Sequence, residues 1–115
     1  MRIILDVDGT LTRDGSGDGY ADRAPRADVI ARVRAAKAAG HEVVIHSARN
    51  MRTHAGDLGR INRLTLPTLL DWLARHDVPF DAIHMGKPWC GDRGFYVSAN
   101  GMRPSQWVED RADRP

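Results

Sequence analysis

Short runs of apolar, β-branched residues alternate along this chain with segments of helical periodicity, and this alternation limits the folds open to it. The runs lie at 3–7, 42–46, 81–85 and 94–98. Helical segments begin at Pro25, Pro67 and Pro104, and the first carries apolar residues three and four apart before it ends at Gly40. Strands that alternate with helices predict βαβ crossovers, and therefore an α/β fold with a mostly parallel sheet.

The length of the chain predicts one domain with one core. A domain of 115 residues, spanning 1–115, leaves little material for a separate lid over a site. The single cysteine, Cys90, excludes an internal disulfide and suits a reducing compartment, and no apolar run approaches the ~20 residues of a membrane helix. Met1 leads directly into an acidic motif, so we expect no signal peptide, a cytoplasmic location and no membrane binding.

The charge balance is only mildly basic, with a net charge of +2 and a pI near 9.1. Such an excess suits an anionic small molecule at least as well as a nucleic acid. The bases are scattered and form no stripe with interleaved aromatic residues, so we expect no nucleic-acid partner.

Polar residues follow the carboxyl end of each predicted strand. In open parallel sheets ligands bind outside these ends, so the four segments are expected to lie on one rim. They are Asp6-Val7-Asp8, Ser47-Ala48-Arg49, Gly86-Lys87 and Ser98-Ala99-Asn100.

Asp6 and Asp8 are the strongest chemical signal. Alternate residues of a strand project to the same side, so the two carboxylates are expected to repel each other unless a cation such as Mg²⁺ lies between them. One carboxylate can then attack a phosphoryl group while the other protonates the leaving oxygen. A lone Asp-x-Asp more often caps a turn, but here a buried strand precedes it and Gly9-Thr10-Leu11-Thr12 follows.

Ser47 and Lys87 complete the predicted catalytic set. The Ser47 hydroxyl can hold a phosphoryl oxygen, and the Lys87 ammonium can neutralise the transferring charge. Taken alone, Ser47 is more often a strand-end turn residue, and a single lysine such as Lys87 can be a solvated surface residue. The neighbouring residues are the candidates for binding the substrate: Gly9, Thr10, Ala48 and Arg49.

Asp6-x-Asp8-Gly9-Thr10, Ser47 and Lys87 resemble, in this order, the first three motifs of the haloacid dehalogenase (HAD) superfamily. Further stretches, among them 47–53 and 86–91, resemble small capless phosphatase-like proteins associated with bacterial capsular polysaccharide biosynthesis. The resemblance implies a Rossmann-like, three-layer domain without a cap, an aspartyl-phosphate on Asp6, and a small phosphorylated substrate. It also implies Mg²⁺ held by Asp6, by the backbone carbonyl of Asp8 and by an acidic fourth motif.

The fourth motif departs from this pattern. Ser98 and Ala99 occupy the positions where such proteins carry a pair of Asp residues, so Ser98 is left as the candidate metal ligand. A neutral hydroxyl is a weaker partner for a dication than a carboxylate. Two functions therefore stay open: a phosphatase with weakened metal binding, or an impaired relative that binds a phosphorylated ligand or a protein partner.

Two long segments and the missing cap add further expectations. The Gly-rich segment 12–24, with Tyr20, could form a flap over the site, and 49–65 is predicted to be a long loop that either reads the substrate or is merely solvated. We expect a homo-oligomer, because a neighbouring subunit could supply the cover that a capless domain lacks.

Overall fold

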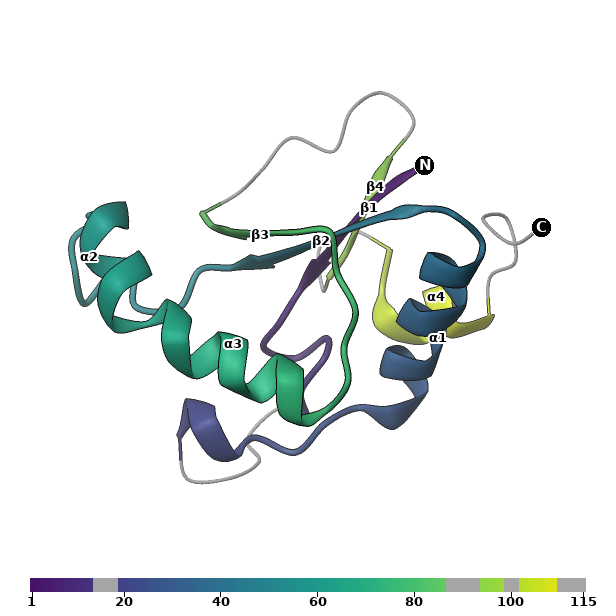
Figure 1. Cartoon of the computed structure of the whole chain (residues 1–115), viewed down its shortest axis with the longest axis horizontal. Helices are drawn as coiled ribbons and strands as arrows, with labels where there is room; N and C mark the ends of the chain where they lie inside the picture. The colour runs from purple at the N-terminus through teal and green to yellow at the C-terminus, as the bar shows by residue number, and fades with distance from the viewer. Residues whose placement is uncertain (14–18, 87–93, 99–101, 110–115) are drawn as a thin grey trace.

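The sheet is parallel throughout, and its order places the strand that carries Asp6 in the interior. The computed structural model describes residues 1–13, 19–86, 94–98 and 102–109. There, β1 (Arg2–Asp6), β2 (Glu42–Ser47), β3 (Ala82–Met85) and β4 (Phe95–Val97) form one sheet in the order β3-β2-β1-β4 (Figure 1). Every neighbouring pair is parallel. The predicted α/β class is confirmed, and the arrangement is compatible with a Rossmann-like fold.

Three helices fall close to their predicted positions. They are α1 (Ala27–Ala38), α3 (Leu66–Arg75) and α4 (Pro104–Glu109). α1 begins two residues later than expected because Pro25 is bridged to Thr12, and Arg26 N–H donates to the Leu11 carbonyl at 2.8 Å. Gly40, at φ 91°, follows the end of α1 in the left-handed region that favours glycine.

The prediction of a long loop over 49–65 was wrong, because this segment contains α2 (Leu58–Leu64). The Asp57 side chain caps the helix by accepting a hydrogen bond from Arg60 N–H at 3.1 Å, and Ile61 is fully buried. Asp57 followed by one apolar anchor was the available signal, but a helix of 7 residues is too short to show clear periodicity. A short 3₁₀ helix, η1 (Tyr20–Asp22), lies within the predicted flap.

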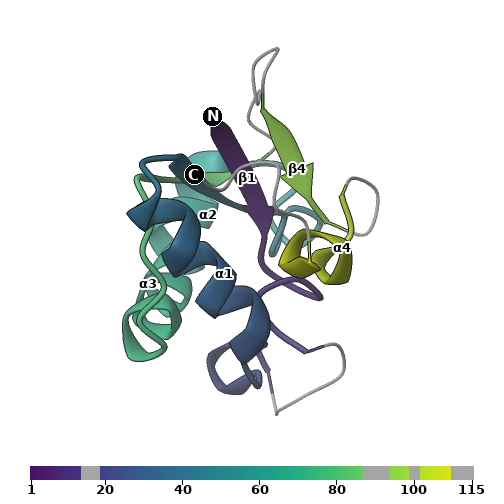
Figure 2. The same ribbon diagram turned by 90° about the vertical axis from the view of Figure 1, so that its right-hand side faces the viewer.

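Both faces of the sheet are buried along β1 and β2. Ile4 and Val44 are fully buried on one face. Ile3, Leu5, Val43 and Ile45 are fully buried on the other, where the main core cluster lies. They cluster with apolar side chains of all four α-helices, including Val29, Val33, Ile61, Leu69, Trp72, Leu73 and Trp107. α4 lies beside α1 (Figure 2). Within the described part of the chain, the expected three-layer domain is thus seen as a sheet with one layer of helices.

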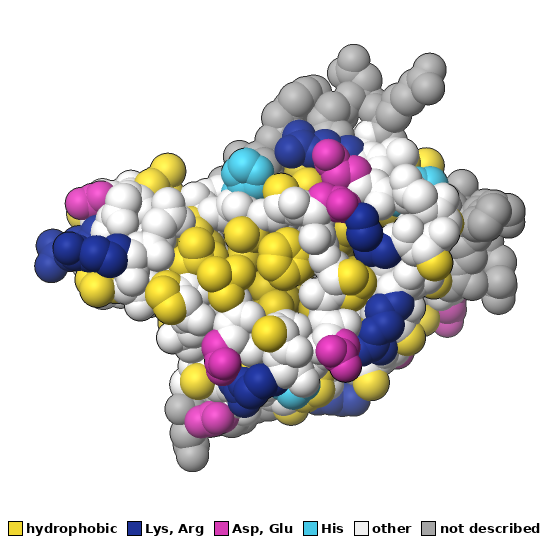
Figure 3. All heavy atoms as spheres, in the orientation of Figure 1, with side chains coloured by type: hydrophobic (Ala, Val, Ile, Leu, Met, Phe, Trp, Pro, Cys, Tyr) yellow, Lys and Arg dark blue, Asp and Glu magenta, His cyan; other side chains and the backbone are white. Residues whose placement is uncertain are grey.

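Apolar side chains are not all buried. Leu69, Trp72 and Leu73 of α3 face the core, but Leu70 of the same helix is 40% exposed. Leu58 and Leu64 of α2 are also exposed. Apolar side chains gather on the surface between α3 and β3 (Figure 3). The homo-oligomer stays a prediction.

None of the described helices has the length and apolar character needed to cross a membrane.

Candidate active site

The carboxyl ends of β1, β2 and β4 bring several of the predicted site residues to one rim. Asp6 ends β1 and is in register with His46, so Ser47 lies one residue further along the neighbouring strand. On the other side Leu5 is in register with Val97, which places Ser98 just past the end of β4. Lys87 and Ala99 lie outside the described residues.

The Asp6 carboxylate is half-buried, and few polar groups offset the cost of that burial. Its Oδ1 accepts a hydrogen bond from Val7 N–H at 2.9 Å, and His46 Nδ1 lies 3.8 Å from the same oxygen. Burial raises the pKa of Asp6 above its usual value, and the repulsion of Asp8 adds to this, while the Val7 amide and His46 oppose it. A carboxylate in this position can bind a cation or attack an electrophile.

Both oxygens of the Asp8 carboxylate accept hydrogen bonds from Arg49, a pairing that the sequence did not reveal. Arg49 Nε donates to Asp8 Oδ2 and Nη2 donates to Oδ1, each at 2.9 Å. The Arg49 side chain is only 1% exposed, and Arg23 Nε adds an ion pair to Asp8 at 3.6 Å. The guanidinium of Arg49 thus forms a two-pronged bond that fixes the orientation of the Asp8 carboxylate, and its role in substrate binding stays a prediction.

Tyr20 closes this cluster from the side of η1. The guanidinium carbon of Arg49 lies 4.3 Å from the centre of the Tyr20 ring, and that of Arg23 lies 5.4 Å from it. Trp72 Nε1–H holds the segment against α3 by donating to the Arg23 carbonyl at 2.8 Å. The predicted flap therefore supplies an aromatic ring and a cation to the surroundings of Asp8.

The turn after β1 is held by its own hydrogen bonds. The Val7 carbonyl accepts from the amides of Thr10, Leu11 and Thr12 at 2.9–3.1 Å. Gly9 has φ 78°, and its N–H donates to Thr12 Oγ1 at 3.2 Å. Thr10 is only 1% exposed, and its role in substrate binding stays a prediction.

The residues at the end of β2 differ in exposure. Ser47 is buried, and its Oγ accepts a hydrogen bond from Arg49 N–H at 3.1 Å. This bond joins Ser47 to the residue that holds Asp8. Ala48, between them, is exposed at the rim.

Metal ligands are few on this rim. The described residues contain no group of three or more His, Cys, Asp or Glu side chains that could hold a metal ion. Ser98 N–H donates to the Met102 carbonyl at 3.0 Å. The predicted metal ligands stay a prediction: the Asp6 carboxylate, the Asp8 backbone carbonyl and the Ser98 hydroxyl would offer the ion one carboxylate.

The chain is similar over 97% of its length to a Vibrio cholerae protein whose crystal structure is described as that of an MCSG target. The two are 46% identical, the match covers 90% of that protein's chain, and the TM-score is 0.80. The chain belongs to the family of this Vibrio cholerae protein. That description states no activity, and neither a family model nor a curated protein matches the chain.

This chain shares its fold with one part of a larger protein. About 80% of this chain matches 29% of a chain from the Pnkp1/Rnl/Hen1 complex, at 21% identity and a TM-score of 0.55. A D,D-heptose 1,7-bisphosphate phosphatase from B. bronchiseptica, solved with magnesium and phosphate, has a TM-score of 0.49 at 20% identity over 80% of this chain and 52% of its own. A TM-score below 0.5 does not establish a shared fold.

Proposed function

We propose that this chain is a Mg²⁺-dependent phosphomonoester hydrolase of the HAD type, with Asp6 as its nucleophile. The observation that carries the proposal is the position of Asp6 at the end of an interior parallel strand, beside Asp8 and Ser47. The order of the HAD-like motifs supports the same assignment. The resemblance to capsule-associated proteins favours a sugar phosphate or a related biosynthetic intermediate as the substrate.

The reaction needs two displacements at phosphorus. An oxygen of Asp6 forms a bond to phosphorus while the bond to the leaving oxygen breaks, and Asp8 gives that oxygen a proton. A water molecule, deprotonated by Asp8, then attacks phosphorus and breaks the bond to Asp6. Inorganic phosphate leaves, and both carboxyl groups return to their starting states.

The remaining residues hold and neutralise the phosphoryl group. The Ser47 hydroxyl and the backbone at Ala48 would bind its oxygens, and Lys87 would offset its charge. Mg²⁺, when bound, would neutralise the negative charge that builds up around phosphorus. With one carboxylate, one carbonyl and one hydroxyl, the protein suits an ion completed by substrate phosphate and water rather than one held by protein alone.

A second function is favoured by the bond between Asp8 and Arg49. Both oxygens of the Asp8 carboxylate accept a hydrogen bond from Arg49, and a protonated Asp8 would lose one of these. Together with Ser98 in place of an acid, this favours a protein that binds a phosphorylated ligand or a partner protein without turning the ligand over.

Phosphate release from a panel of phosphomonoesters tests the proposal, with the assay run in Mg²⁺ and in EDTA. We expect release that requires Mg²⁺ and is lost in Asp6→Asn, whose fold is checked by circular dichroism. Full activity in Asp6→Asn would exclude Asp6 as the nucleophile. No release from any substrate would favour the binding protein.

A further inference from the structure

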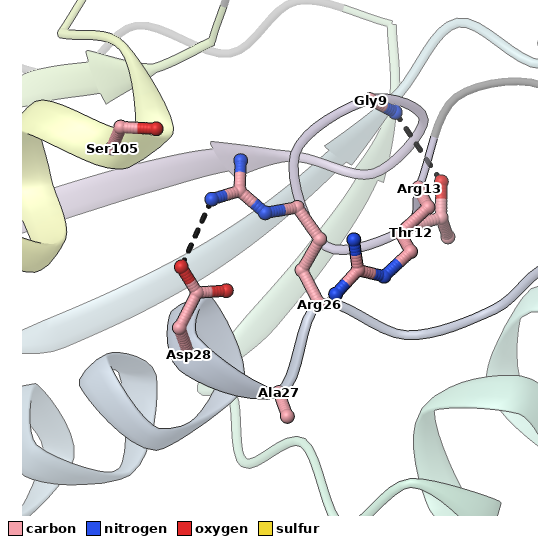
Figure 4. Close-up of a pocket in the computed structure, with 7 residues that line it drawn as sticks. All are labelled: Gly9, Thr12, Arg13, Arg26, Ala27, Asp28 and Ser105. Carbon is pink, nitrogen blue, oxygen red and sulfur yellow. Dashed lines mark hydrogen bonds and ion pairs between the residues drawn. The ribbon is translucent and has the colours of Figure 1, made fainter.

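A groove beside the candidate active site carries an excess of positive charge. It has a volume of about 650 Å³ and is lined by residues of the turn after β1, the start of α1 and the start of α4 (Figure 4). Such a volume falls within the range of small-molecule sites. The lining residues are Gly9, Thr12, Arg13, Arg26, Ala27, Asp28 and Ser105.

Two guanidinium groups enter the groove against one carboxylate. Arg26 Nη2 donates to Asp28 Oδ2 at 3.0 Å, and the Arg13 side chain lies beside Arg26 (Figure 4). The Arg26 side chain is 21% exposed and is thus partly held by its surroundings, while that of Asp28 is 49% exposed. An ion pair this open to water is weak, so a stronger anion can compete for Arg26.

A hydroxyl group lies near these charges. Ser105, near the start of α4, lines the groove, whereas Thr12 on the other side is fully buried and its Oγ1 already accepts a hydrogen bond from Gly9 N–H. Guanidinium forks with a nearby hydroxyl suit the several oxygens of a phosphate or carboxylate group. Gly9, which follows Asp8 directly, forms part of the same wall, so the groove adjoins the rim that carries Asp6.

We propose that this groove binds a phosphate or carboxylate group of a small molecule, with Arg26 as its principal charged contact. The anion is either a second anionic group of the substrate or a separate free anion. Binding itself does not depend on Asp6 being a nucleophile, whereas the substrate alternative rests on the proposed function.

Amide chemical shifts of the ¹⁵N-labelled full chain, titrated with inorganic phosphate against chloride at equal ionic strength, test the binding. We expect Arg26 and Ser105 to shift together, apart from any shift at the rim residues Ser47 and Ala48. Arg26→Gln should weaken the groove affinity about tenfold, as expected for the loss of one charge-assisted contact. Asp28→Asn should strengthen it, because it removes the competing carboxylate.

Arg60→Gln, an exposed arginine on α2, is the matched control and should leave the groove affinity unchanged. Absence of phosphate-dependent shifts at Arg26 and Ser105 would overturn the proposal, whatever the phosphatase assay shows. A weaker groove affinity in Asp28→Asn would also overturn it. Groove shifts in a protein that hydrolyses no phosphomonoester would keep this inference and remove the proposed function.

Glucose 6-phosphate and glucose 1,6-bisphosphate distinguish the two sources of the anion. If the groove receives a second group of the substrate, the bisphosphate should have the higher kcat/KM, and Arg26→Gln should abolish that preference. If it receives a free anion, both sugars should react equally and inorganic phosphate alone should shift the groove amides. In both cases Arg26→Gln must reduce the shifts, and its failure to do so would contradict the assignment.

Discussion

Burial of the Asp6 carboxylate should carry a stability cost that depends on pH. Because burial raises the pKa of Asp6, the folded state binds its proton more readily than the unfolded state, so this group lowers stability as pH rises from about 4 toward neutrality. Asp6→Asn removes the charge, and its melting temperature should exceed that of the unsubstituted protein by a few degrees at pH 7 but not at pH 3.5.

Asp81→Asn is the control of opposite sign for that experiment. The Asp81 carboxylate accepts hydrogen bonds from Lys37, at 2.6 Å, and from Val43 N–H, at 2.8 Å, and both bonds lower the pKa of Asp81. This carboxylate stabilises the fold above its unfolded pKa and loses its effect as pH falls. Asp81→Asn should therefore melt lower at pH 7, and the difference should shrink in acid. Equal melting profiles of Asp6→Asn and the unsubstituted protein would contradict the stability cost at Asp6.

The two hydrogen bonds from Arg49 to Asp8 predict that the loss of kcat in an Arg49 variant depends on the leaving group of the substrate. Arg49→Lys keeps a positive charge but cannot form the two-pronged bond, so Asp8 loses its fixed orientation. We expect kcat for an alkyl phosphate to fall roughly 10- to 100-fold, and kcat for 4-nitrophenyl phosphate to change much less, because its leaving group needs no proton. Equal losses for both substrates would show that Arg49 does not act through Asp8.

The hydroxyl at Ser98 predicts weak metal binding. Ser98→Asp adds a second carboxylate near Asp6, and we expect the apparent Mg²⁺ affinity to rise by about tenfold. Calorimetric titration of both proteins with MgCl₂ measures this, with Ser98→Ala as the matched variant that adds no charge. Unchanged affinity in Ser98→Asp would show that this position does not face the ion.

At the scale of elements, the hydrogen bond from α3 to the segment around η1 links the core to the surroundings of Asp8. Trp72→Phe removes the donor to the Arg23 carbonyl, and we expect faster amide hydrogen exchange over 19–23 with a loss of about 1 kcal/mol in stability. Trp107→Phe is a suitable control, because Trp107 Nε1 is buried and has no hydrogen-bond partner among the residues described. Unchanged exchange in Trp72→Phe would remove this link.

At the scale of the whole molecule, a single buried cluster joins the sheet to the helices, so the described fold should unfold as one unit. Ile45, fully buried in β2, is part of that cluster. Ile45→Ala should lower the free energy of unfolding by about 3 kcal/mol, and the exposed Leu70→Ala should change it by less than about 0.5 kcal/mol. Urea unfolding followed by tryptophan fluorescence measures both, and a large effect of Leu70→Ala would place that side chain in an interface.

The strands, most of the helices and the rim where the strands end could be predicted from the sequence, because apolar runs and helical spacing are local patterns. The sequence also indicated Asp6, Asp8 and Ser47, since strand ends in a parallel sheet meet on one edge. Which side chains meet became known only from the fold. Arg49 lies 41 residues from Asp8 in the chain and binds it through two hydrogen bonds, and Arg26 lines a groove together with Ser105. Such pairings depend on strand order and on how a turn packs against a helix, which residue spacing along a chain does not record.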